Sequence, residues 1–326
     1  MLLQNGYVAI NLKNSKIDTE TIKTEIKKSY GNIAKGNVET GCCNSTDCCG
    51  TNNFIKPMSE DYAQIEGYVQ DADYSLGCGL PTEIANISEG NVVLDLGSGA
   101  GNDVFVARRI VGEKGRVIGI DMTPEMIEKA NNNKSKLGYE NVEFHLGEIE
   151  DMSFIESGLV DVVISNCVMN LIPDKEKAFK EVFRVLKKGG HFSISDIVYK
   201  GTLPNEILES AELFSGCIAG ASHKETYLGI IKAVGFKNIQ VKKERIIDSL
   251  SDELLLNYLT TAQLDEFRKS GSGIYSITVY ADKLDEGTCC DTTENECCGT
   301  ETAISEKIEK SACCGTTSNS NSSSCC

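Results

Sequence analysis

Short apolar runs alternate with amphipathic stretches through the middle of the chain. Runs of about four to eight apolar residues that end in turns are typical of strands buried on both faces of a sheet. We therefore expect strands at Asn91–Asp95, Arg116–Asp121, Val142–Leu146, Asp161–Ser165, His191–Val198, Asn238–Val241 and Ile274–Tyr280.

Helices are expected between these strands, because start and stop signals flank the amphipathic stretches. The expected helices are Asn102–Val111, Pro124–Gly138, Asp174–Gly189, Ser222–Gly235 and Ser251–Arg268. In the fourth helix, Ser222 and Glu225 have the spacing of a capping box. The alternation predicts a doubly wound, mostly parallel α/β sheet with helices on both faces. The stretch Leu203–Gly220 lacks a strand pattern, and we expect it to form a helical insert over one face.

The two ends of the chain are polar and rich in cysteine. Residues 31–53 and 286–326 contain few large apolar side chains, so they cannot bury enough surface to offset the entropy of ordering. We expect both segments to be disordered, or to be ordered by a bound metal.

The composition is that of an acidic globular protein. The 326 residues are 40% hydrophobic, enough for one large core or two modest ones, and carry a formal net charge of −16. This acidity disfavours nucleic acid and anionic membranes as partners. Neither a membrane-spanning apolar stretch nor a secretory signal is visible, so we expect a cytosolic protein.

Fifteen cysteines occur in two patterns. Twelve form six adjacent pairs in the polar ends, whereas Cys78, Cys167 and Cys217 stand singly in the middle of the chain. Cytosolic thiols are kept reduced, and an odd count fits a closed disulfide framework poorly. We therefore interpret these cysteines as ligands, nucleophiles or redox groups.

A glycine-rich turn, Asp95-Leu-Gly97-Ser-Gly99-Ala-Gly101, follows the first expected strand. Such a turn can be purely structural, but its glycines also let backbone N–H groups approach a ligand. Asn102 takes the place of the third glycine of the dinucleotide fingerprint, which disfavours a nicotinamide or flavin cofactor. An acid before Gly-x-Gly-x-Gly resembles motif I of the class I S-adenosylmethionine-dependent methyltransferases. That resemblance implies S-adenosylmethionine as the cofactor.

Further candidate cofactor contacts follow the next strands. Asp121, at the end of the second strand, can accept hydrogen bonds from both ribose hydroxyls, and Glu150, after the third, can accept one from the adenine amine. A backbone N–H of the same loop, which contains Ile149, can reach the adenine N1. Asn166 follows the fourth strand and Met122 follows Asp121, and we expect both among the cofactor contacts.

The three single cysteines lie beside glycines or at a strand end. Cys167 follows the fourth strand, at the edge where open α/β sheets bind ligands. Cys217 lies among the small residues of Ser215–Ala221, and Cys78 lies in the loop Tyr74–Pro81. One such cysteine is commonly a small buried hydrophobe, but three in these places favour a site.

Six segments resemble the arsenite S-adenosylmethionine methyltransferases: Tyr74–Pro81, Asp95–Gly101, Gly119–Pro124, Gly147–Asp151, Ser165–Leu171 and Ser215–Ala221. The resemblance implies that Cys167 and Cys217 bind trivalent arsenic and that Cys78 completes the trio, in binding or in disulfide cycling. It also implies a further cysteine upstream, for which Cys48 or Cys49 is the candidate.

The implied chemistry suits these residue types. Soft thiolates bind a soft metalloid, and arsenic held by two or three sulfurs keeps a lone pair that can attack the sulfonium methyl group in line. Arsenic loses no proton, so no general base is needed, and catalysis is mostly positioning and desolvation. Tyr74 is a candidate to face the sulfonium, and packing within its loop is the alternative.

We therefore expect a monomeric arsenite methyltransferase that serves arsenic detoxification. Its implied cofactors are S-adenosylmethionine and a thiol reductant, thioredoxin or glutathione, and its other ligands are methylated trivalent arsenicals. The expected parts are an N-terminal segment, a cofactor-binding domain, an arsenite-binding insert with the last strands, and a disordered tail, at residues 1–56, 57–200, 201–285 and 286–326.

Two other functions stay open at this point. The chain could be a methyltransferase for an organic small molecule, with metal-binding tails, or a metalloid-binding protein without enzymatic activity. The paired cysteines either capture arsenite and pass it to the core or form a dispensable appendage.

Overall fold

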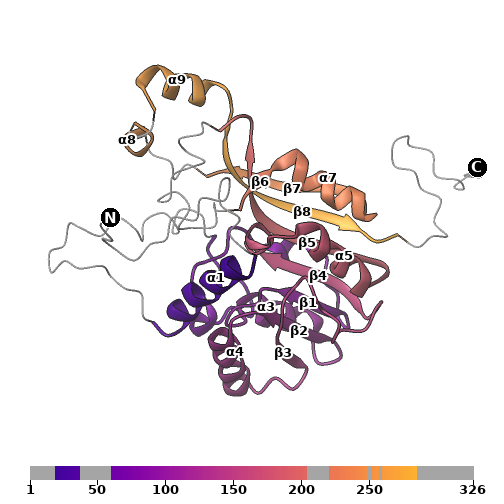
Figure 1. Cartoon of the computed structure of the whole chain (residues 1–326). Coiled ribbons are helices and arrows are strands. Elements are labelled where there is room, and N and C mark those ends of the chain that lie inside the picture. The colour runs from indigo at the N-terminus through magenta and orange to yellow at the C-terminus, as the bar shows by residue number, and fades with distance from the viewer. Residues whose placement is uncertain (1–18, 37–59, 204–219, 248–251, 257–258, 285–326) are drawn as a thin grey trace, which may run out of the picture. The chain divides into compact units, whose positions relative to one another are not determined.

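The computed structural model describes residues 19–36, 60–203, 220–247, 252–256 and 259–284 (Figure 1). The six cysteine pairs, and the insert expected between Leu203 and Gly220, lie outside these described residues.

The described strands form one sheet in the order β3-β2-β1-β4-β5-β8-β7, and a short strand, β6, pairs with β5. The strands are β1 Val92–Leu96, β2 Arg116–Asp121, β3 Val142–Leu146, β4 Val160–Asn166, β5 Leu186–Lys200, β6 Ser222–His223, β7 Lys237–Ile246 and β8 Gly273–Asp282. Neighbours run parallel, except that β8 is antiparallel to both β5 and β7. The strand order reverses between β1 and β4, so a crevice for a ligand is expected at their carboxyl ends.

Helices cover both faces of the sheet (Figure 1). The described α-helices are α1 Thr19–Ala34, α2 Pro81–Ile84, α3 Asn102–Val111, α4 Pro124–Leu137, α5 Lys175–Val185, α7 Lys224–Val234, α8 Asp252–Leu255 and α9 Thr261–Lys269. Two short 3-10 helices, η1 Gln70–Ala72 and η2 Met169–Leu171, lie in loops. Helices α3 and α4 contribute to the apolar core on one face, and α5 and α7 to the core on the other. The predicted doubly wound, mostly parallel fold is thereby confirmed.

The sequence signals for helix ends explain most of these boundaries. Pro124 opens α4, and Gly138 ends it in the left-handed conformation with φ of 67°. The Asp174 carboxylate accepts a hydrogen bond from the Lys177 N–H and caps α5.

The capping box predicted at Ser222 and Glu225 is wrong. Ser222 and His223 are extended, because Ser222 pairs with Val198 of β5 as strand β6. Helix α7 therefore begins at Lys224, and the His223 ring nitrogen Nδ1 accepts a hydrogen bond from the Glu225 N–H. Sheet pairing here outweighs the local capping signal.

Two other helix predictions need correction. The helix expected to reach Gly189 ends at Val185, since Leu186 already pairs with Val160 and Gly189 donates a backbone hydrogen bond to Lys283. The single helix expected over Ser251–Arg268 is two helices, α8 and α9. Among the described residues, no helix combines the length and apolarity that crossing a membrane would require.

Candidate functional site

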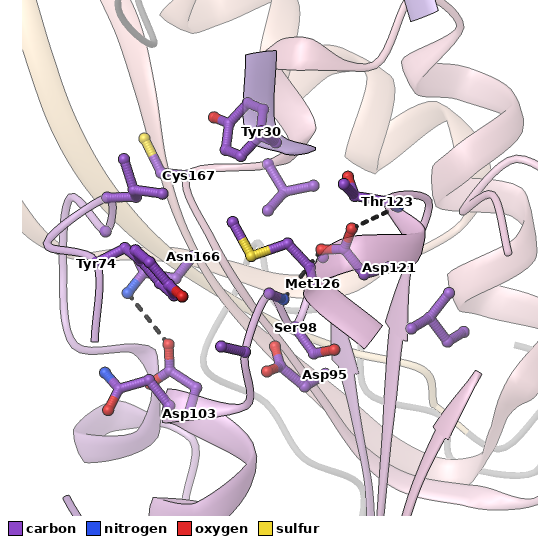
Figure 2. A pocket seen from close by; sticks show the side chains of 18 of the residues that line it. Tyr30, Tyr74, Asp95, Ser98, Asp103, Asp121, Thr123, Met126, Asn166 and Cys167 are labelled. Atoms are coloured by element: carbon purple, nitrogen blue, oxygen red, sulfur yellow. Dashed lines mark hydrogen bonds between the residues drawn. The ribbon is translucent and has the colours of Figure 1, made fainter. Parts of the chain in front are cut away.

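A cavity opens at the carboxyl ends of β1, β2, β3 and β4, where the strand order reverses (Figure 2). Ten of the residues predicted from the sequence line it: Tyr74, Asp95, Gly97, Gly99, Asp121, Met122, Ile149, Glu150, Asn166 and Cys167. Cys78 and Gly101 lie next to this set and are not among the lining residues. Cys48, Cys49 and Cys217 lie outside the described residues.

The glycine-rich turn needs glycine for two different reasons. A Cβ on Gly101, where φ is 100°, would lie 2.8 Å from the rings of Phe105 and Phe144, so close packing excludes a side chain. A Cβ on Gly99, where φ is 52°, would meet only the Met126 sulfur at 4.0 Å and would take space from the cavity. The turn thus presents bare backbone to whatever fills the cavity.

Three carboxyl groups gather around this turn. Asp95 is 2% exposed, and its burial, followed by the charges of Asp103 and Asp121, raises the pKa of that carboxyl well above its usual range. Burial also raises the pKa of Asp103 to about 6, although hydrogen bonds from Tyr62 and Asn166 lower it. Because burial disfavours their ionised forms, a cation in the cavity would be strongly favoured.

Asp121 organises the loop as well as lining the cavity (Figure 2). Its Oδ2 accepts a hydrogen bond from the Gly99 N–H at 3.0 Å, and its Oδ1 accepts one from the Thr123 N–H at 2.8 Å. Burial raises the pKa of Asp121, and these hydrogen bonds offset only part of that increase. The end of β2 and the glycine turn are thereby held together.

The amino-terminal helix α1 closes one side of the cavity, a placement that sequence reasoning missed. The disorder expected from residue 31 is wrong for its first residues, because α1 continues to Ala34, whose side chain is buried in the core. Its Ile26 and Tyr30 are lining residues. The Lys23 ammonium lies 2.7 Å from a carboxylate oxygen of Glu148 and 3.2 Å from one of Glu150. Burial lowers the pKa of Lys23, but the two acids outweigh it, so the net shift is upward. The amphipathic spacing of α1 was the available signal.

Asn166, at the end of β4, joins the cavity to the loop that carries Cys78. Its Oδ1 accepts hydrogen bonds from the N–H groups of Cys78 at 2.9 Å and Gly79 at 3.2 Å. Its Nδ2 donates to the Gly79 carbonyl at 2.8 Å and to the Tyr62 hydroxyl at 2.6 Å. The amide thus holds the Cys78 backbone against the strand that precedes Cys167.

Glycines on both sides of Cys78 make this contact possible. A Cβ on Gly77 would lie 2.6 Å from the Asn166 Nδ2, and a Cβ on Gly79 would lie 2.5 Å from the Ser195 Oγ. The motif Gly-Cys-Gly is therefore required by close packing against β4 and β5, which explains why these residue types occur there.

Cys78 and Cys167 are both buried, at 0% and 3% exposure, and belong to one apolar cluster with Ile197 of β5 and Leu255 of α8. Cys167 has a φ of 61°, an uncommon conformation for a residue other than glycine. Their charges both contribute to raising the pKa of the buried Tyr227 hydroxyl, after burial itself and Asp196. The fold therefore brings together two of the three single cysteines that the sequence singled out.

Several lining residues were not predicted. The largest group consists of polar residues in or near the glycine turn: Tyr62, Ser98, Asn102, Asp103 and Thr123. The Ser98 Oγ and the Asn102 Oδ1 are buried and have no hydrogen-bond partner among the described residues. Buried polar atoms of this kind fit a site that a polar ligand completes. The available sequence signal for Ser98, Asn102 and Asp103 was their position in or directly after the glycine turn, whereas Tyr62 and Thr123 are distant from it in sequence.

Comparison with known proteins agrees with this geometry. Residues 87–252 match the family model for a methyltransferase domain. The chain is 37% identical to the arsenite methyltransferase of Halobacterium salinarum over 76% of this chain and 67% of that protein. It is 32% identical to the arsenite methyltransferase of Aquipseudomonas alcaligenes over 80% of this chain and 72% of that protein.

A solved structure is similar as well. The arsenic(III) S-adenosylmethionine methyltransferase of Chlamydomonas reinhardtii aligns with a TM-score of 0.55 and 37% identity, over 64% of this chain and 68% of that one. With both sequence relatives matched over two thirds of their length or more, this chain belongs to the arsenite methyltransferase family.

Proposed function

We propose that this protein transfers the methyl group of S-adenosylmethionine to trivalent arsenic that is held by Cys78, Cys167 and Cys217. One observation carries the proposal: Cys167 lines the acid-rich cavity, and the neighbouring Asn166 binds the backbone of Cys78. A cofactor in the cavity and a metalloid bound to the two sulfurs would thus lie next to each other at the carboxyl end of β4.

The cavity suits S-adenosylmethionine in charge and in hydrogen bonding. When bound, S-adenosylmethionine supplies an electrophilic methyl group on a positively charged sulfur. Asp95, Asp103 and Asp121 would offset the positive charge. The unsatisfied Ser98 and Asn102 oxygens would accept hydrogen bonds from the ligand.

The nucleoside end is assigned to the far side of the cavity. There Asp121 ends β2 and Met122 follows it, and Ile149 and Glu150 follow β3. Glu150 already pairs with Lys23, so its carboxylate would hold the adenine and α1 together.

Arsenic is the substrate, and the cysteine thiolates are its ligands. Cys217 precedes Gly220 by three residues. Gly220 packs so tightly against the turn after Cys167 that a Cβ would lie 2.2 Å from the Asn170 carbonyl oxygen. Cys217 itself lies outside the described residues, and its part in holding arsenic is proposed from its place in the sequence.

Methyl transfer balances without a base on the protein. The arsenic lone pair forms the new As–C bond, and the bond between the methyl carbon and the sulfonium breaks with its electron pair left on sulfur. Arsenic is oxidised by two electrons, which a thiol reductant, glutathione or thioredoxin, would return. The residues of this chain would hold, orient and desolvate the reactants.

Tyr74 is the candidate for contact with the sulfonium. It lines the same cavity as Asn166 and Cys167 (Figure 2). An aromatic ring there would favour a cation over the neutral product.

We further propose that the protein acts as a monomer in the reducing cytosol on arsenite and methylated trivalent arsenicals, and binds neither nucleic acid nor membrane.

The test is direct. Purified protein is incubated with arsenite, S-adenosylmethionine and a thiol reductant, and the arsenic species are separated by chromatography. We expect methylated arsenic from the wild type, and a loss of about 100-fold or more in Cys167→Ser with cofactor binding kept. Cys326→Ser is the matched control and should keep its activity.

Two results would end the proposal: no methylated arsenic from the wild type, or full activity in Cys167→Ser. Labelled methyl transfer to an organic acceptor, insensitive to the loss of Cys167, would instead support a different methyltransferase.

A further inference from the structure

Asp196 of β5 is a buried acid that the proposed reaction does not use. It is 0% exposed. Its Oδ1 accepts a hydrogen bond from the Ile197 N–H at 2.9 Å. The Tyr227 hydroxyl of α7 is also fully buried, and burial, followed by the charge and hydrogen bonding of Asp196, raises its pKa well above the usual range. A buried polar pair of this kind is costly unless its members hold each other in place.

The turn that follows Cys167 lies beside this pair. The Cys167 N–H donates to the carbonyl of Ser195, the residue before Asp196, at 2.8 Å. The Lys175 ammonium donates to the carbonyls of Asn170 at 3.2 Å and Ile172 at 3.0 Å. These contacts hold the 3-10 helix η2 and, with it, the left-handed backbone of Cys167. A strained residue persists only where its surroundings hold it in place.

Electrostatics connects Asp196 to the same turn. Burial raises its pKa to about 6, and the Ile197 N–H, Lys175, Tyr227 and the Asn170 N–H each lower it. Burial lowers the pKa of Lys175, whereas the charges of Asp196 and Glu150 raise it. Asp196 thus interacts with groups from β5, η2, α5 and α7.

We propose that Asp196 and Tyr227 are positioning residues for Cys167: with Lys175 they fix the turn Cys167–Leu171, so that the Cys167 sulfur faces the cavity beside Cys78. The use of that sulfur for arsenic rests on the proposed function. The positioning of Cys167 does not depend on the proposed function. It would make the core between β5 and α7 part of the site, in addition to the cysteines.

The experiment compares Asp196→Asn and Tyr227→Phe with the wild type in the full chain. Asp161→Asn, at the opposite end of β4, is the matched control. The first measurement is the alkylation rate of Cys167 by iodoacetamide, resolved from the other cysteines by peptide mass spectrometry. The second is steady-state kinetics with arsenite and S-adenosylmethionine, and thermal unfolding confirms that each variant folds.

We expect the Cys167 alkylation rate to change by about threefold or more in both variants, because the turn is released. We expect kcat/KM for arsenite to fall by about tenfold or more while KM for S-adenosylmethionine stays within about twofold. If Asp196 and Tyr227 only stabilised the fold, the kinetic constants for arsenite and for S-adenosylmethionine would change to the same extent. Asp161→Asn should leave the Cys167 alkylation rate and both sets of kinetic constants unchanged.

Each result is decisive. An unchanged alkylation rate of Cys167 in both folded variants overturns the positioning role, even where the wild type methylates arsenite. If the wild type makes no methylated arsenic but Cys167 alkylation still responds, the positioning holds and the proposed function fails.

Discussion

At the scale of single residues, the site depends on polar side chains that serve the backbone and the cavity together. Asn166 accepts hydrogen bonds from the N–H groups of Cys78 and Gly79, and Asp121 accepts one from the Gly99 N–H of the glycine turn. Both also line the cavity. A buried amide or carboxylate that holds a loop has little freedom to move, so the site is rigid where it must be accurate.

The close packing of Gly79 makes a sharp prediction. In Gly79→Ala the new Cβ would lie 2.5 Å from the Ser195 Oγ, a side chain that is 0% exposed and cannot yield. We expect a loss of about 1–3 kcal/mol in the free energy of unfolding, measured by chemical denaturation. Gly229→Ala is the control: nothing lies within 4 Å of its Cβ, and a helix gains about 0.5–1 kcal/mol from alanine. Equal stability of the two variants would contradict the packing argument.

Asp103 should make cofactor affinity depend on pH. Its pKa is raised to about 6, so without a ligand the carboxyl is largely neutral below that pH. A cation in the cavity favours the ionised form, and binding must then release a proton. Affinity for S-adenosylmethionine should therefore rise from pH 5 to pH 7, by up to about tenfold per pH unit below 6.

Isothermal titration calorimetry across this pH range measures the effect. Asp103→Asn should flatten the profile, and the exposed Glu89→Gln should leave it as in the wild type. A wild-type affinity that does not change between pH 5 and pH 7 would argue against a cationic ligand next to Asp103.

At the scale of elements, α1 is the part that completes the cavity. Lys23 of α1 is 8% exposed and lies between Glu148 and Glu150, and Lys27 pairs with Glu148 as well. The loop after β3 would carry two uncompensated acids without this helix. We infer that α1 and the cofactor stabilise each other.

Loss of the Lys23 charge should loosen α1. In Lys23→Met the buried Glu150 loses its ion pair with Lys23 while Glu148 keeps its ion pair with Lys27, at a cost of about 1–3 kcal/mol. Hydrogen exchange of the α1 amides should become about tenfold faster or more, and S-adenosylmethionine should dissociate faster. Lys28→Met removes an exposed lysine of the same helix and should do neither. Unchanged α1 exchange in Lys23→Met would show that the ion pairs do not hold the helix.

At the scale of the whole molecule, the last described strand marks where the folded core can be cut. Lys283 exchanges two backbone hydrogen bonds with Gly189 and Gly190, and its ammonium donates to the carbonyls of Phe183 and Leu186. The four cysteine pairs from Cys289 onward lie beyond it, outside the described residues.

Truncation after Lys283 tests whether these pairs capture arsenite. The contacts of Lys283 are kept, so the thermal unfolding midpoint should not change. If the tail delivers arsenite, turnover at low arsenite should fall by about threefold or more while turnover at saturation stays the same. Unchanged turnover at low arsenite would identify the tail as dispensable.

Local sequence patterns predicted the helices and strands well, because the spacing of apolar residues and the capping and stop residues of helices depend only on nearby positions. All seven expected strands occur, with bounds that differ by a few residues. The failures arose where distant pairing decided the outcome. Ser222 became a strand residue because Val198 pairs with it, and Leu186 left its helix because Val160 pairs with it. No local signal carries that information.

The sequence by itself determined which chemistry is available: a glycine turn with acids at the strand ends, and thiols in place of a general base. Only the tertiary structure decided which groups meet. Cys78 reaches Asn166 across 88 residues, and Lys23 reaches Glu148 across 125. The raised pKa of Asp103 and the burial of Asp196 likewise depend on the surrounding fold. Residue type is a local property, whereas desolvation and contact are created by packing between distant segments.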